Sequence, residues 1–175
     1  MKQTKYDYID RYQEGFARVE FNDKYNFIDE QGNTISETWF VWCSSFSEGL
    51  AAVKLNDRWN FIDKQCSYLN DQWFDACGDF HEGFAKVQLK GRDNYIDKQC
   101  KYLSDQWFDY CWSFNEGFAR IKLNGKYNFI DYHGYILSDV WFDWCFNFNE
   151  GFAVVTINGE IKTINTKGEI INEKN

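Results

Sequence analysis

The chain contains no proline, one methionine and two histidines in 175 residues, and no apolar run of 18 residues. Without such a run we expect no membrane-spanning helix. Positive charge is also scarce, with 19 lysines and arginines against 27 acidic residues and a formal net charge of −8. Duplex DNA and anionic membranes are bound through clustered lysine and arginine, so we expect neither as a partner. The start, MKQTKYDYIDRYQ, lacks the apolar stretch of a signal peptide, which predicts a cytoplasmic protein.

The chain is built on a period of 34 residues. A Glu-Gly pair recurs at Glu14-Gly15, Glu48-Gly49, Glu82-Gly83, Glu116-Gly117 and Glu150-Gly151, and Trp39, Trp73, Trp107 and Trp141 keep the same spacing. A fixed period predicts tandem units that share one continuous core. We therefore predict a single repeat domain, 1–175, with full repeats at 14–47, 48–81, 82–115 and 116–149 and half-repeats at 1–13 and 150–175.

Each unit begins with an alternating segment that predicts a half-buried strand. Apolar residues alternate with polar ones through 16–21, 50–55, 84–89, 118–123 and 152–157. Two-residue turns follow, such as Asn124-Gly125, which is a strong hairpin signal because a type I′ turn needs positive φ at both residues. Returning strands are expected at 25–28, 59–62, 93–96, 127–130 and 161–164. A helical 34-residue repeat is excluded by this period-two alternation.

A second turn closes each hairpin with an Asp and a Gly, as in Asp29 to Gly32. Two units have Cys66 and Cys100 where the others have glycine, so either these cysteines are strained or the turn has changed type. A third short strand is expected after this turn, at 34–35 and its equivalents. All six cysteines keep the repeat spacing, which favours reduced thiols over disulfides.

The segment from Ser104 to Gly117 supports two interpretations. Trp107, Cys111 and Phe114 lie at helical spacing and no proline interrupts them, whereas the aromatic content favours a strand. The predicted fold is therefore all-β, with stacked hairpin repeats and either a short helical turn or a fourth strand in each. Polar terminal hairpins, with Lys5, Lys162 and Thr163 at core positions, favour an open curved array with capped ends. A closed five-bladed, propeller-like ring is the alternative.

Residues 46–65 and 116–134 resemble the bacterial WG repeat, also called the KWG repeat. The shared pattern is Phe-x-Glu-Gly-Leu-Ala-x-Val, then a turn, an aromatic residue and Ile-Asp. This chain departs from it because Asn26, Asn60, Asn94 and Asn128 replace the family's glycine, and because the family's proline is missing. The resemblance implies β-rich tandem repeats of bacterial or phage origin and a non-catalytic role.

The residues needed for metal or catalytic chemistry are not arranged for either. The cysteine spacings of 34 and 11 residues fit no zinc module, and the repeat places neither His81 nor His133 beside a cysteine. The glutamates of the Glu-Gly pairs could serve as acid and base, but a catalytic pair is normally unique, so we assign these residues to the turns. We expect no metal, no cofactor and no enzymatic activity.

Aromatic residues at variable repeat positions are the candidate binding residues, because rigidly held aromatic rings anchor protein partners and stack on sugars. They are Trp42, Trp59, Tyr110, Trp112 and Trp144. The first hypothesis is a non-enzymatic protein-interaction module, in particular an inhibitor or immunity-type factor in bacterial or phage conflict. The second is a glycan- or cell-wall-binding module. A third interpretation is that these rings only cover the edge of the core.

Overall fold

The computed structural model describes residues 5–171, in which all regular secondary structure is β. The strands form five antiparallel sheets that follow one another in chain order. The sheets are β1 (Tyr8–Ile9), β2 (Phe16–Phe21) and β3 (Lys24–Asp29); β4 (Trp42–Cys43), β5 (Leu50–Leu55) and β6 (Arg58–Asp63); β7 (Ala76–Cys77), β8 (Ala85–Leu89) and β9 (Arg92–Ile96); β10 (Tyr110–Asn115), β11 (Phe118–Leu123) and β12 (Lys126–Asp131); and β13 (Trp144–Cys145), β14 (Phe152–Ile157), β15 (Glu160–Asn165) and β16 (Ile170–Ile171).

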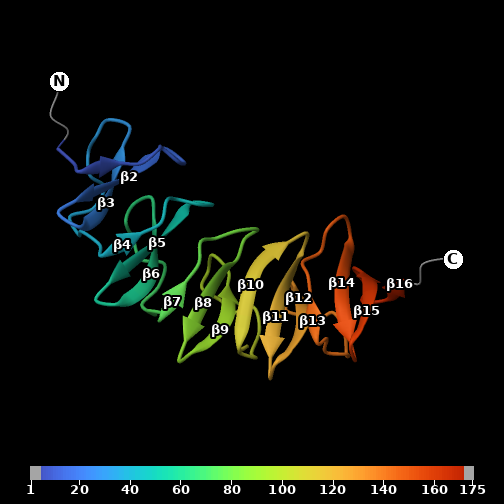
Figure 1. Ribbon diagram of the computed structural model, residues 1–175. Coiled ribbons are helices and arrows are strands. Elements are labelled where there is room, and N and C mark those ends of the chain that lie inside the picture. The colour runs from blue at the N-terminus through green and yellow to red at the C-terminus, as the bar shows by residue number, and fades with distance from the viewer. Residues whose placement is uncertain (1–4, 172–175) are drawn as a thin grey trace.

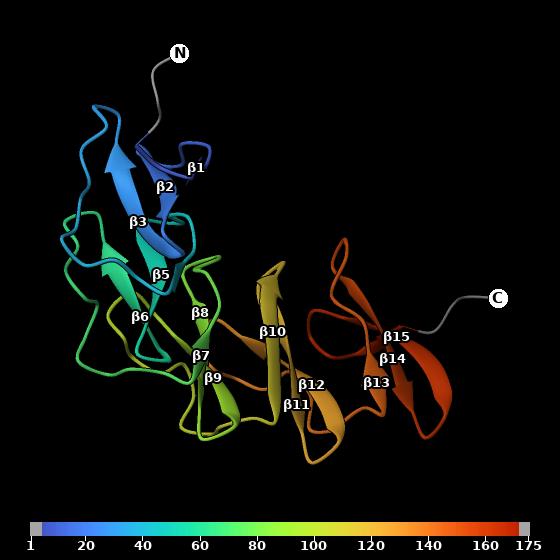
Figure 2. The same cartoon turned by 60° about the vertical axis from the view of Figure 1, so that its left-hand side comes forward.

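The five sheets are arranged along an open arc, with the first and last sheets at its opposite ends (Figures 1 and 2). This is the open curved array expected from the sequence, and the sheets do not close into a ring. No residue from 5 to 171 is helical, so of the two interpretations of the segment around Trp107 the helical turn is excluded and the strand is confirmed. Phe108 instead bridges Asp93, and the chain continues directly into strand β10.

The central hairpin of each sheet has the turn chemistry that its sequence predicts. Asn124 and Gly125 have φ of 50° and 80°, as a type I′ turn between β11 and β12 requires. The Glu-Gly pairs form a second set of two-residue turns, because Glu116 and Gly117 have φ of 52° and 86°. Each Glu-Gly pair thus lies between the short first strand of a sheet and its central hairpin.

Neighbouring sheets are joined by a short crossover, in which only Val41 separates Phe40 from Trp42, the first residue of β4. Phe40 exchanges two backbone hydrogen bonds of 2.9 Å with Tyr25 of β3, and Cys43 then pairs with Val53 of β5. The same step recurs at Phe74, Phe108 and Phe142. The chain therefore finishes one sheet and begins the next without a free loop, which fixes the spacing of neighbouring sheets.

The core lies between the sheets. Phe46, which follows the crossover, packs on Phe27 of the preceding hairpin with ring centroids 4.8 Å apart. Phe27 and Phe46 share a buried cluster with Val53 and Ile62 of the next sheet. Because both neighbours contribute to each cluster, a sheet buries its apolar side chains only when the adjacent copy is in place.

A buried asparagine on each of the first four returning strands holds the loop that leads to the crossover. Asn128 is fully buried, its Nδ2 donates to the carbonyls of Ser138 at 2.7 Å and Val140 at 3.3 Å, and its Oδ1 accepts from the N–H of Phe129 at 2.9 Å. Asn26 and Asn94 repeat all three bonds, and Asn60 repeats two of them. These residues are the equivalents of the family's glycine.

The second turn keeps one type in every unit, so the cysteines in it are strained. Cys66 and Cys100 have φ of 62° and 60°, close to the 83° of Gly32 at the same position. Asp63 Oδ1 accepts from the N–H groups of Gln65 and Ser67, as Asp29 Oδ1 does from Gln31 and Asn33. The third short strand predicted after this turn is a single bridge in four units and the two-residue strand β16 in the last.

We predict that Asn128→Ala lowers the free energy of unfolding by about 1–3 kcal/mol, because it leaves the carbonyls of Ser138 and Val140 without their donor and the buried N–H of Phe129 without its acceptor. The measurement is urea denaturation followed by tryptophan fluorescence. Asn147→Ala, at an exposed asparagine of the same repeat, is the control and should change stability by less than about 0.5 kcal/mol. Equal effects of the two substitutions would contradict the role given to Asn128.

Candidate interaction surface

Cross-strand pairing places the variable aromatic residues in rows across the sheets. In the second sheet Trp42 pairs with Lys54, and Lys54 pairs with Trp59. In the fourth sheet Tyr110, Lys122 and Tyr127 are paired in the same way. Directly opposed residues on neighbouring strands project from the same face, so each row brings two rings and a lysine together.

In the fourth and fifth sheets these rings join into one aromatic row, consisting of Tyr110, Trp112, Tyr127, Trp144 and Phe146. Its successive ring centroids lie 4.4, 5.9, 4.8 and 6.3 Å apart. Tyr110, Trp144 and Phe146 are 44%, 42% and 59% exposed, whereas Tyr127 is buried beneath them. The row therefore combines a buried centre with exposed ring edges.

The five residues selected from the sequence fall into two groups. Tyr110, Trp112 and Trp144 belong to the aromatic row, where Tyr127 connects them. Trp42 and Trp59 form a separate aromatic pair in the second sheet, 5.1 Å apart and edge to face. Tyr127 was not selected from the sequence as a binding residue, although it lies on the predicted returning strand 127–130.

Cations lie over the rings of both groups. Arg120 is 4.6 Å from the ring centroid of Trp112, Lys122 is 5.2 Å from that of Tyr127, and Lys54 is 5.9 Å from that of Trp59. These are distances at which a cation is attracted to the ring face. A chain with a net charge of −8 thus presents aromatic rings and positive charge together on one surface.

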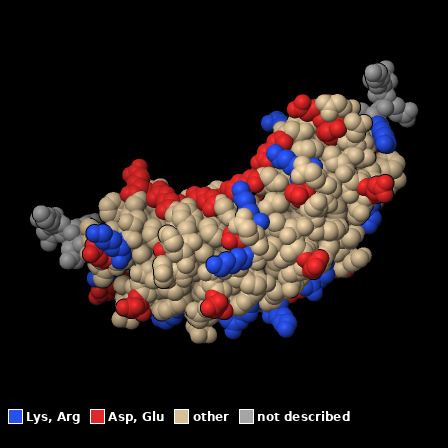
Figure 3. Space-filling view, turned by 180° about the vertical axis from the view of Figure 1, so that it is seen from behind, with Lys and Arg blue, Asp and Glu red and all other residues tan. Residues whose placement is uncertain are grey.

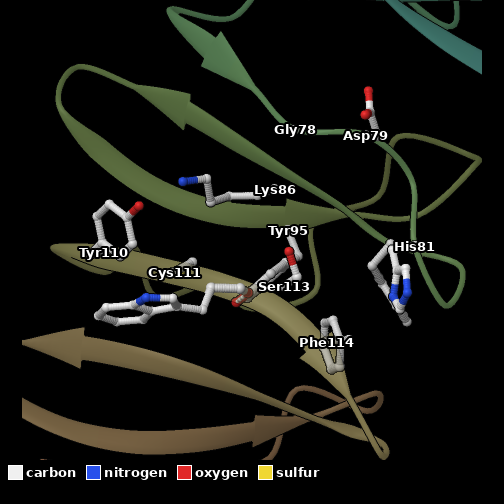
Figure 4. Close-up of a pocket in the computed structure, with 11 residues that line it drawn as sticks. Gly78, Asp79, His81, Lys86, Tyr95, Tyr110, Cys111, Ser113 and Phe114 are labelled. Atoms are coloured by element: carbon white, nitrogen blue, oxygen red, sulfur yellow. Dashed lines mark hydrogen bonds between the residues drawn. The ribbon is translucent and has the colours of Figure 1, made fainter. Parts of the chain in front are cut away.

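The third sheet interrupts this pattern. The positions that hold two rings and a lysine elsewhere are occupied by Ala76, Gln88 and Asp93. A hollow of about 160 Å³ lies here, the central hollow, lined by Gly78, Lys86, Tyr95, Tyr110, Trp112 and their neighbours (Figure 4). A shallower groove of about 560 Å³ lies beside it against Lys122 and Tyr127, and Tyr110 and Trp112 line both.

The glutamates of the Glu-Gly pairs are structural. The carboxylate of Glu48 accepts the N–H of Gly83 at 3.0 Å, and that of Glu116 accepts the N–H groups of Glu150 and Gly151 at 2.9 and 3.0 Å. Glu14, Glu48 and Glu116 therefore each link their own Glu-Gly turn to the Glu-Gly turn of the next repeat. Glu82 departs from this pattern by accepting from the hydroxyl of Tyr132.

These turns lie on the inner side of the arc, where the loop between β10 and β11 is visible (Figure 1). Acidic side chains follow this concave edge in a continuous line (Figure 3). Burial alone would raise the pKa of Glu48, but its bonds to Lys98 and to the backbone of Gly83 outweigh that effect and lower its pKa. Glu14, with Lys64 and Gly49 as partners, is shifted in the same direction for the same reasons.

All six cysteines are free thiols. Burial raises the pKa of Cys43 and Cys145 to about 12 and that of Cys100 to about 11. Thiols held in the neutral form are poor nucleophiles. Cys66 and Cys100 pack against core clusters instead of pairing with each other. Between residues 5 and 171, no three His, Cys, Asp or Glu side chains gather as a metal site would require, and no helix has the length and apolarity of a membrane span.

Comparison with known families confirms the resemblance seen in the sequence. The model of the WG-containing repeat matches residues 3–25, 27–59, 74–92, 95–127 and 129–160, which is most of the chain. The chain belongs to the WG-containing repeat family. No protein with a curated description matches this WG-repeat chain.

Solved structures with a similar fold include Kluyveromyces lactis Hsv2p and KlHsv2 with its loop 6CD replaced by a Gly-Ser linker. The first has a TM-score of 0.50 at 11% identity over 94% of this chain and 62% of its own. The second has a TM-score of 0.51 at 11% identity over 93% of this chain and 64% of its own. The WG-repeat chain thus spans less than two thirds of either structure, and at this identity the likeness shows the fold alone.

We predict that Glu48→Gln destabilises the protein near neutral pH and weakens the dependence of its stability on acid. A carboxylate whose pKa is lowered on folding stabilises the fold above its unfolded pKa, and this contribution is lost as the pH falls through the folded value. Wild-type stability should therefore decline as the pH drops below the ordinary value of 4.5, and the variant should decline less.

Urea denaturation at a series of pH values from neutral to acid measures both effects. The matched control is Glu37→Gln, at an exposed glutamate. Parallel stability curves for wild type and Glu48→Gln would show that the carboxylate does not stabilise the turn.

Proposed function

We propose that this WG-repeat chain is a protein-binding module without catalytic activity, acting in the cytoplasm. The observation that carries the proposal is the aromatic row, in which exposed rings are held rigidly by a buried centre. Binding energy at protein interfaces is concentrated in a few aromatic and arginine side chains seated among well-packed neighbours. Tyr110, Trp112 and Arg120 have this composition and setting.

The repeated carboxylates support a role without catalysis. A general acid or base must be available to exchange a proton with substrate. Glu48 and Glu116 are instead engaged with the backbone of the next turn in the same geometry along the array. Both carboxylates thus hold neighbouring turns together, which is a structural role.

Cations over the rings favour a protein partner over a glycan. Stacking on a sugar uses an open ring face, and one face of Trp112, Tyr127 and Trp59 already meets a cation. Lysine and arginine set among aromatic rings provide charge and apolar contact to a partner in the same place. The partner's surface is therefore acidic and apolar. An inhibitor or immunity-type role in bacterial or phage conflict is the specific form of the proposal that the sequence motivates.

The double substitution Tyr110→Ala and Trp144→Ala tests the proposal. The wild-type chain is used as bait in an extract of its native host, and recovered proteins are quantified by mass spectrometry. A true partner should be recovered by wild type and then bind the purified double variant at least about 30-fold more weakly, since the loss of even one anchor costs about 2 kcal/mol.

Tyr135→Ala is the control, because Tyr135 is 72% exposed and belongs to the turn region instead of the aromatic row. It should bind as wild type does. A partner that binds the double variant and the control equally well would place the interface elsewhere. Binding of oligosaccharides on a glycan array, abolished by Trp144→Ala, would support the glycan alternative. Loss of the partner's own activity on binding would support the inhibitor role.

A further inference from the structure

The central hollow arises where one sheet departs from the side chains that its neighbours share. At the first position of the short strand segment the other four sheets have an aromatic ring, and at the third position each has a side chain. These pairs are Tyr8 and Asp10, Trp42 and Ser44, Tyr110 and Trp112, and Trp144 and Phe146. The third sheet has Ala76 and Gly78 there. A ring and a second side chain are thus missing at the middle of the array, and the hollow lies there.

The backbone does not require the glycine. The other eleven glycines have positive φ, whereas Gly78 is outside that region, so its conformation is open to any residue. A Cβ at Gly78 would meet the Cβ of Lys86 at 3.9 Å, an ordinary contact. The backbone conformation therefore does not explain the glycine at position 78, whereas its missing side chain leaves space for the hollow.

The same sheet carries a carboxylate that the other sheets lack at the equivalent position. Asp93 stands where they have Tyr25, Trp59, Tyr127 and Ile161. Lys86 stands where the preceding sheet has Ala52 and the following sheet has Arg120. Asp93 is fully buried and accepts from Gln88 Nε2 at 2.9 Å and from the N–H of Cys111 at 3.0 Å. The ammonium of Lys86 lies 3.5 Å from the carboxylate of Asp93.

The buried carboxylate of Asp93 holds Lys86 in position but does not occupy all the N–H donors of its ammonium group. Lys86 Nζ lies 4.4 Å from the ring centroid of Tyr110, between that ring and Asp93. An ammonium has three N–H donors, and one directed at Asp93 leaves others for a ligand. Figure 4 shows Lys86 extending over the hollow toward Tyr110, while the carboxylate of Asp79 at the rim points away.

We infer that the central hollow receives a carboxylate side chain, an Asp or Glu of the protein partner. Lys86 supplies a charge-assisted hydrogen bond, and Tyr110, Trp112 and Phe114 enclose the methylene part of the side chain. In the adjoining groove Lys122 has no ion-pair partner among the residues described, whereas Asp109 is paired with Arg92, so this groove also offers positive charge. A cation would meet the ammonium of Lys86 in the same space. This inference rests on the proposed function and names the chemistry of its central contact.

A small probe tests the hollow without the partner. The probe is N-acetyl-glutamate N-methylamide, titrated at constant ionic strength into ¹⁵N-labelled protein while the indole N–H of Trp112 is followed by NMR. The glutamine and lysine analogues are titrated in parallel. The glutamate probe should give a saturable chemical-shift change. The glutamine analogue should bind with at least about tenfold lower affinity, because the charge-assisted hydrogen bond is lost. The lysine analogue should give no saturable change.

The matched variant, called the transplanted variant, gives the third sheet the side chains that the second sheet has at four equivalent positions. Ala76→Trp, Gly78→Ser, Lys86→Ala and Asp93→Trp introduce the residues present at Trp42, Ser44, Ala52 and Trp59. The ion pair is removed as a unit, so no unpaired buried charge remains. This variant should fold, as judged by its NMR spectrum, and should lose the response to the glutamate probe. Should it fail to fold, Gly78→Ser alone fills part of the hollow and should weaken the response.

Equal shifts with the glutamate and glutamine probes, no saturable shift, or a response retained by the transplanted variant would each overturn the inference. Once the partner is in hand, the two proposals separate. A transplanted variant that binds the partner as wild type does, while the Tyr110→Ala and Trp144→Ala variant does not, leaves the binding module standing and removes the carboxylate contact. If neither variant weakens binding, both proposals fail.

Discussion

The fold depends on the crossover between sheets. Phe40 completes the hydrogen bonding of one sheet, and the N–H of Val41 already donates to Lys54 of the next, so the two ladders are bonded to consecutive residues of one segment. Phe46 then fills the space between the hairpins that the crossover has spaced. Each hairpin alone would expose its phenylalanine, and a two-stranded hairpin is marginally stable in water. Stability is therefore a property of neighbouring pairs, and the array gains it by repetition.

Hydrogen bonds between repeats reinforce this coupling at both ends of the hairpins. Glu48 fastens the Glu-Gly turn of the next repeat, and Asn60 fastens the loop that leads to it. In the family pattern the position of Asn60 is a glycine and a proline stiffens the loop. Here the asparagine side chain supplies by hydrogen bonding the restraint that the missing proline would supply through its ring.

Much of the fold could be predicted from the sequence because each element has a local signature. Period-two alternation identified the hairpins, and Asn124-Gly125 identified a type I′ turn that the structure confirms. The segment around Trp107 could not be assigned, since its aromatic spacing fits a helix and its strand pairing depends on Asp93, a residue of another element. Burial of both faces of the returning strand was likewise invisible, because it arises from the neighbouring repeat.

The candidate surface was predictable only in part, for a related reason. Tyr110, Trp112 and Trp144 were selected because aromatic side chains at variable positions stand out, whereas Tyr127 joins them only in three dimensions. Ala76 and Gly78 carry no chemistry of their own and were not selected. They stand out only when the repeats are compared. Ala76 occupies a position that is aromatic in the other units, and Gly78 occupies one that carries a side chain in all of them.

A repeat scaffold tolerates the changed side chains of the third sheet. The crossover bonds are made by backbone groups, including those between Phe108 and Asp93. Gly78 donates its backbone N–H to the carbonyl of Lys86 at 2.9 Å, and Ala76 pairs with Gln88, so the side chains of these residues can change while the backbone bonds remain. Asp93 is the exception, since its carboxylate accepts the N–H of Cys111 at the start of the next sheet. The residue that positions Lys86 therefore also ties the hollow to the coupling on which the array depends.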